Sequence, residues 1–155
     1  MTYPKTKKIM NEIVADLTQT HMLVHQHHWY MLGRGFLKLH PYLDEVMDEL
    51  AEQQDGVAER LIEINGSPIS TYEEVLEETN VPDQLGSWDL SIEERFQLIV
   101  NAYKQLRDDY ERGIKISEDE GDDSTNDLLI AYHTAVEKRI WMMSAELGQR
   151  PGEGE

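Results

Sequence analysis

Apolar residues recur at helical spacing through four long segments of this 155-residue chain, and that periodicity constrains the fold more than any other feature. No stretch of useful length alternates with the two-residue period of a strand, and no internal repeat or low-complexity block is present. The four series span roughly residues 9–31, 43–61, 92–120 and 128–147. The pattern therefore predicts an all-α bundle of long helices.

Capping residues predict where several of these helices begin. Thr71 followed by Glu74 forms a capping box, which predicts a short helix over about 71–78. A second capping box, Ser91 with Glu94, opens the third long helix. The segment 67–90 must then cross from one helical pair to the next, with the short helix inside it.

Two further expectations concern the ends of helices and of the chain. Pro41 is expected in the first turn of the second long helix, where a missing N–H is tolerated. Gly121 and Asp122 interrupt the pattern and separate the last two helices. Residues 1–155 are predicted to form one domain, with flexible tails at 1–8 and 148–155.

The charge balance is strongly acidic. The chain has 14 lysines and arginines but 31 aspartates and glutamates, which gives a formal net charge of −17. Such a surface repels nucleic acid and anionic membranes and attracts cations. The alternative explanation is that the acidity serves only to keep the protein soluble.

Cysteine is absent from the chain, which excludes disulfides and thiol catalysis and suits a reducing cytoplasm. The opening MTYPKTKKIM has no apolar core of a signal peptide, and no apolar run approaches the length of a membrane span. The sequence therefore predicts a cytoplasmic protein without a membrane segment.

Histidines and carboxylates with helical spacing gather in thirty-five consecutive residues. Imidazole nitrogen mixed with carboxylate oxygen suits iron, manganese or zinc. Taken singly, each histidine is more often a surface or satisfied core residue and each carboxylate an ordinary solvated group, so only their coincidence favours a metal site. Four of them share one face of the second helix, within about 100° at 100° per residue, on the flank of its apolar stripe. The candidate ligands are His25, His28, His40, Asp44, Asp55 and Glu59.

The spacing along the second helix argues that one chain cannot complete such a site. Asp44 and Asp55 are eleven residues apart, about 16 Å along a helix, whereas paired metals lie about 3.5–4 Å apart. A second copy related by a twofold axis could join the two ends and form two identical sites. No histidine has a glutamate three positions before it, so the Glu-x-x-His signature of a site inside one bundle is missing.

Three motifs together resemble the Dps family of miniferritins, and the resemblance covers nearly the whole chain. They are H-x-x-H-W at 25–29, F-x-x-L-H-x-x-x-D at 36–44, and D-x-x-A-E-R at 55–60 followed by Gly-Ser-Pro at 66–68. The resemblance implies a ferritin-like four-helix bundle with a short extra helix in the crossover between helices 2 and 3. It also implies a dodecameric shell that oxidises Fe(II), preferentially with hydrogen peroxide, and stores the ferric mineral.

The same resemblance implies a role for each residue of the site. His28, His40 and Asp44 would come from one subunit, and Asp55 and Glu59 from its partner. Each such site would bind two iron ions, with zinc or manganese as competitors. Beside it, Trp29 would take part in electron transfer or scavenge radicals, and His25 would be an auxiliary ligand.

Three acidic residues match the family's iron-entry pores at threefold axes: Glu118, Asp122 and Asp127. Three copies of each would focus a negative potential on incoming Fe(II). The alternative is that these residues only solubilise and cap helix ends, a role open to Asp122, Asp123 and Ser124.

Two other functions remain open from the sequence. One is a non-enzymatic zinc or nickel buffer that uses His21, His25 and His28. The other is a nucleoid-associated structural protein, for which the charge is wrong. Members of the family that bind DNA usually do so through lysine-rich terminal extensions, but here only three lysines, at 5, 7 and 8, precede the first helix and the tail is acidic. DNA binding is therefore not expected.

Overall fold

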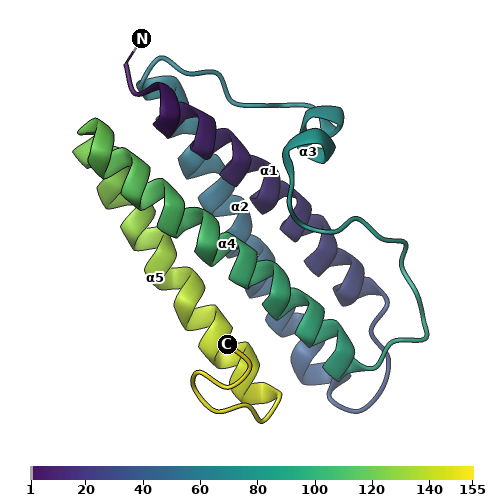
Figure 1. Ribbon diagram of the computed structural model, residues 1–155. Coiled ribbons are helices and arrows are strands. Elements are labelled where there is room, and N and C mark those ends of the chain that lie inside the picture. The colour runs from purple at the N-terminus through teal and green to yellow at the C-terminus, as the bar shows by residue number, and fades with distance from the viewer. Residues whose placement is uncertain (1) are drawn as a thin grey trace.

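A computed structural model describes residues 2–155, and within that range it contains five α-helices and no strand (Figure 1). Four long helices lie side by side as a bundle, which confirms the predicted all-α fold. No helix within 2–155 is both long and apolar enough to cross a membrane. The helices are α1 (Pro4–Trp29), α2 (Phe36–Glu63), α3 (Tyr72–Glu78), α4 (Ile92–Glu120) and α5 (Asp123–Glu146).

Two helical hairpins make up the bundle. In the first, α1 packs against α2; in the second, α4 packs against α5, and α1 contacts α4 between them. The long segment between α2 and α4 runs the length of the bundle on its outside and carries α3 against α1 (Figure 1). This is the crossover predicted from the sequence.

The core consists of the apolar stripes of the four long helices. Ile13 and Leu17 of α1, Leu43 of α2, Phe96 of α4 and Val136 of α5 are all fully or almost fully buried. Burying one such side chain stabilises the fold by about 1.5–3 kcal/mol. The periodic residues of the sequence are therefore the ones that hold the helices together.

Both predicted capping boxes are present. The Glu74 amide donates to Thr71 Oγ1 at 3.2 Å, and the Thr71 amide donates to Glu74 Oε1 at 3.1 Å. The Glu94 amide donates to Ser91 Oγ at 3.0 Å, and the Ser91 amide donates back to Glu94 Oε2 at 2.7 Å. Each box satisfies two amides that the first turn of a helix leaves without partners.

The expected position of Pro41 is wrong. The second helix already begins at Phe36, so Pro41 is its sixth residue and lies beyond the first turn. Its ring removes the N–H that would have bonded to the carbonyl of Leu37. The side chain of Leu37 is 88% exposed, so the missing bond is on the solvent side of the helix, where water can replace it.

Both predicted tails make contacts in this structure. At the N-terminus α1 already includes residues 4–8, and the amide of Thr6 donates to Glu120 Oε1 at 2.6 Å. At the C-terminus the chain turns back after α5, and Arg107 Nη1 donates to Glu155 Oε1 at 2.8 Å. The mobility of these segments remains a prediction.

The side chain of Tyr132 in α5 lies against Gly56 of α2, where an added Cβ would overlap the tyrosine hydroxyl. We expect Gly56→Ala to destabilise the fold by about 1–3 kcal/mol through overpacking, offset by up to about 1 kcal/mol of helix propensity. In a Tyr132→Phe background the overlapping oxygen is gone, so the same substitution should be less harmful. Urea unfolding of the four proteins measures the coupling, and an equal effect in both backgrounds would contradict this contact.

Candidate metal centre

Three histidines form a row on one face of α1. The ring centroids of His21 and His25 are 6.0 Å apart, and those of His25 and His28 are 5.9 Å apart. His25 also stacks on Trp29 at 3.8 Å. Burial lowers the pKa of His21, and burial together with the neighbouring His21 and His28 lowers the pKa of His25. Both rings are therefore uncharged at neutral pH, the form that binds metals.

His28 and His40 hold each other in place across the turn between α1 and α2. His28 Nδ1 lies 2.8 Å from the carbonyl oxygen of His40, and His40 Nδ1 lies 2.9 Å from the carbonyl oxygen of His28. The two rings stack with centroids 3.6 Å apart and an interplanar angle of 12°. Since a carbonyl only accepts, each Nδ1 carries the hydrogen and each Nε2 keeps a free lone pair for a metal.

Asp44 completes a cluster at this end of α2. It lies one turn after His40, and its Oδ1 is 3.6 Å from His28 Nε2. Its side chain is exposed, whereas His28 is buried. His28 thus lies next to two other predicted ligands, the stacked ring of His40 and the carboxylate of Asp44.

The other two predicted ligands lie elsewhere on α2. Asp55 and Glu59 are exposed, and Asp55 follows Asp44 by eleven residues, about 16 Å along the helix. Across residues 2–155, no three His, Cys, Asp or Glu side chains of a single chain are arranged to hold a metal ion. One subunit therefore presents two separate partial ligand sets along α2.

His27 belongs to the core and not to the row. Its ring is fully buried, and its Nδ1 accepts from Arg95 Nη1 of α4 at 3.2 Å. Burial, and then the charge of Arg95, lower the pKa of His27 to about 4. This pair ties the last turn of α1, which carries His28, to the first turns of α4.

Sequence reasoning assigned no role to Arg95 or to Phe36. Phe36 stacks on the His40 ring at 4.6 Å and so covers the ring face away from His28. A fully buried arginine has no periodic signature that distinguishes it from the surface arginines of an acidic helix. The position of Phe36 four residues before His40 was a usable signal, because i and i+4 side chains are neighbours on a helix.

The three predicted pore residues have different surroundings. Glu118 and Asp127 are exposed, at the end of α4 and the start of α5. Asp122 is buried; it caps α5 by accepting from the Thr125 amide at 3.2 Å and pairs with Arg60 Nη2 at 3.1 Å. The capping role considered for Asp122 is thereby confirmed, and the pore role of all three remains a prediction.

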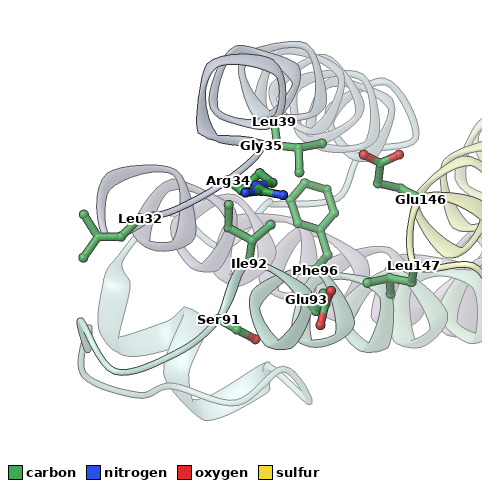
Figure 2. Close-up of a pocket in the computed structure, with 10 residues that line it drawn as sticks. All are labelled: Leu32, Arg34, Gly35, Leu39, Ser91, Ile92, Glu93, Phe96, Glu146 and Leu147. Atoms are coloured by element: carbon green, nitrogen blue, oxygen red, sulfur yellow. The ribbon is translucent and has the colours of Figure 1, made fainter.

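Two of the hollows in the surface bear on the predicted ligands. One, of about 390 Å³, lies between the α1–α2 turn and the facing ends of α4 and α5, where Arg34, Ile92, Phe96 and Leu147 line it (Figure 2). No predicted ligand borders it, so it is separate from the metal centre. The other, a groove of about 520 Å³, lies between α1, α2 and α3 and is bordered by His21.

Comparison with known proteins gives consistent matches over this fold. A family model described as a ferritin-like domain matches residues 7–151. The DNA protection during starvation protein of Streptococcus suis strain P1/7 is 41% identical over 146 residues, which cover 94% of this chain and 85% of that protein. The protein of the same name from Listeria innocua is 42% identical over 146 residues, 94% of each chain. The X-ray structure of Dps from Listeria monocytogenes has a TM-score of 0.93 at 41% identity and covers 96% of both chains.

The bundle, its long crossover and the family match define a ferritin-like protein. Within that class, the chain belongs to the Dps family. The predicted resemblance is thereby confirmed. Membership supports a general role in iron storage and in protection under stress.

We expect Asp122 to stabilise the fold, independently of any role in a pore. Asp122→Ala removes the cap of α5 and leaves Arg60 and Thr125 without their buried acceptor, so we expect a loss of about 2–4 kcal/mol. The matched control is Asp123→Ala, which removes an exposed carboxylate from the first turn of the same helix and should change stability by less than about 1 kcal/mol. Urea unfolding of both variants measures the difference, and equal losses would contradict this role.

Proposed function

We propose that this protein is a ferroxidase of the miniferritin type. It oxidises Fe(II), preferentially with hydrogen peroxide, at di-iron sites shared by two subunits, and stores the ferric mineral inside a dodecameric shell. The observation that carries the proposal is the exchange of Nδ1 hydrogen bonds between His28 and His40, which leaves the Nε2 atom of each ring unused, that of His28 at 3.6 Å from Asp44 Oδ1. A histidine pair oriented in this way suits a metal site better than it suits a solvated surface.

The missing ligands of each site would come from a second copy. In an antiparallel pair related by a twofold axis, Asp55 and Glu59 of one subunit approach His28, His40 and Asp44 of the other. The groove beside His21 supports contact on this side of the bundle, because exposed apolar side chains border it from α1 and α3: Met22, Tyr72 and Leu76. Two identical sites then form in each dimer.

The chemistry of such a site balances two iron ions against one peroxide. Two Fe(II) ions give two electrons and two protons are taken up, which yields two Fe(III) ions and two water molecules. Because the two iron ions deliver both electrons to the same peroxide, no single-electron reduction occurs that would release a hydroxyl radical. The carboxylates of Asp44, Asp55 and Glu59 favour the ferric product, since hard oxygen ligands suit the more highly charged ion.

Neighbouring residues would assist this reaction. Trp29, stacked on His25, would lie beside the site and pass or absorb single electrons, and His25 would serve as an auxiliary ligand. Zinc and manganese would compete for the same donors. Iron would enter at threefold pores lined by the exposed Glu118 and Asp127 together with Asp122, and the protein would work in the cytoplasm.

A second candidate is a zinc or nickel buffer built on the histidine row. The uncharged rings of His21 and His25, next to His28, favour it. Aerobic addition of Fe(II) separates the two functions. A catalyst oxidises iron well beyond two equivalents per site, whereas a buffer stops at its binding stoichiometry.

Mixing two damaged subunits tests whether the site is shared. One variant lacks His28 and His40, the other lacks Asp55 and Glu59, and each alone should oxidise Fe(II) with peroxide at a small fraction of the wild-type rate. After dissociation, equal mixing and reassembly, half the dimers are mixed, and each mixed dimer holds one intact site. About a quarter of the wild-type activity should therefore return.

A site inside one chain would recover nothing in this experiment, because every chain carries damage. Reassembly is verified by size on a column, and a variant with Asp48→Asn and Glu52→Gln, two exposed acids of the same helix, is the matched control. Activity that stays at the level of the separate variants after verified reassembly contradicts the shared site.

The charge of the chain predicts negligible binding to DNA. Affinity for DNA depends on neutralising phosphates with lysine and arginine, and this chain carries −17. A gel-shift assay at neutral pH and roughly physiological salt measures it. The buffer must lack divalent metals, which could bridge two polyanions. A clear shift would contradict this prediction and favour the nucleoid-associated alternative.

A further inference from the structure

Two carboxyl groups meet inside the seam between α1 and α4. Asp16 of α1 and Asp109 of α4 are both 0% exposed, and their side chains are within hydrogen-bonding reach of each other. Neither belongs to the candidate metal centre. Buried carboxyls are rare in folded proteins unless they have partners, so the surroundings of this pair decide its charge.

One oxygen of each carboxyl is fully occupied. Asp16 Oδ1 accepts from the hydroxyl of Thr79 at 2.6 Å and from the amide of Asn80 at 2.7 Å, both in the crossover after α3. Asp109 Oδ1 accepts from Gln105 Nε2 at 3.0 Å and from Arg112 Nη2 at 3.0 Å. The Oδ2 atoms of both residues are sealed from solvent, and no donor of residues 2–155 bonds to either of them.

The charged groups around the pair cannot balance two negative charges. Arg112 is the cation in contact with it, and the same guanidinium also pairs with Glu12 of α1 at 3.1 Å. The crossover contributes only neutral groups, the hydroxyl of Thr79 and the amide of Asn80. Two ionised carboxylates side by side would repel each other strongly in this buried place.

We propose that a single proton, shared by the Oδ2 atoms of Asp16 and Asp109, fastens α1 to α4 and holds the crossover on α1. The proton makes one carboxyl a donor and the other an acceptor, which satisfies both otherwise unpartnered oxygens. Because Asp16 binds Thr79 and Asn80 with its other oxygen, the crossover is attached through the same residue. Loss of the proton in mildly alkaline solution therefore loosens the seam and the crossover together.

The titration of Asp109 agrees with this arrangement. Burial, followed by the bond to Asp16, raises the pKa of Asp109 from 3.8 to about 8. Between about pH 3.8 and pH 8, Asp109 of the folded protein thus keeps a proton that the same residue has released in the unfolded chain. Its contribution to stability is complete below about pH 3.8, declines as the pH rises, and is lost above about pH 8.

Loss of the shared proton would affect the crossover most directly. It carries α3, whose Tyr72 and Leu76 border the groove beside His21. Loosening at Thr79 and Asn80 releases the C-terminal side of α3 from α1, so the groove is expected to change shape in alkaline solution. This inference stands without the proposed iron chemistry, because it concerns only contacts within one chain.

Replacing either aspartate by asparagine tests the shared proton. In Asp16→Asn, the amide nitrogen supplies a permanent hydrogen to Asp109, while the amide oxygen still accepts from Thr79 and Asn80. Asp109→Asn mirrors this change from the other side, so either variant serves if the other fails to fold. Asp89→Asn, an exposed acid in the crossover, is the matched control.

The first measurement is amide hydrogen exchange of residues 79–81 in the assembled protein, corrected for the intrinsic effect of pH. Between pH 7 and 9 the corrected exchange should rise at least tenfold in the wild type and in Asp89→Asn. It should stay flat in the two pair variants. The second is urea unfolding, in which the wild-type unfolding constant should rise up to tenfold per pH unit from pH 6 to 8 relative to the pair variants. If both pair variants keep the wild-type pH dependence in exchange and in unfolding, the shared proton is disproved.

Discussion

The exchange of hydrogen bonds between His28 and His40 is the contact on which the candidate site depends. It joins the last turn of α1 to the first turns of α2. The same two hydrogen bonds therefore fix the turn between the helices and the orientation of both imidazole rings. Arg95 of α4 supports this contact by donating to His27, the residue that precedes His28 in α1. The ends of three helices are thereby fixed at the place where two free Nε2 atoms emerge.

The length of α2 imposes the second constraint. Because α2 rises about 1.5 Å per residue, its two sets of ligands cannot approach each other within one chain, however the side chains rotate. The same rigidity keeps the two sets at a constant separation, which a twofold partner can match at both ends at once. The geometry that keeps the two groups of predicted ligands apart in one subunit would therefore let a twofold dimer complete two of the proposed sites.

The sequence predicted the parts of this structure that depend on neighbouring residues. The apolar stripes, both capping boxes and the end of α4 at Glu120 are local features, and the structure confirms them. The predicted start of α2 is wrong because proline does not mark the first turn here: the helix begins after Gly35, whose φ of 99° only glycine adopts easily. The bonds of His28 with His40, of His27 with Arg95 and of Asp122 with Arg60 join segments far apart in the chain. No local sequence pattern predicts such contacts, and they are seen only in the folded structure.

Lysine and arginine side chains are scarce in this acidic chain, and their positions decide which carboxylates have no ion-pair partner. Arg60 follows Glu59 directly, but its guanidinium is held by Asp122, Thr125 and Glu63 at the start of α5 and the end of α2. Within residues 2–155, neither Asp55 nor Glu59 forms an ion pair with a lysine, arginine or histidine of its own chain. These two carboxylates therefore keep their charge uncompensated on an exposed helix face. A group in that state gains more from binding a metal cation than a neutralised one would, because no ion pair has to be broken first. The arginines that stabilise the bundle thus leave the proposed ligands available by being bonded elsewhere.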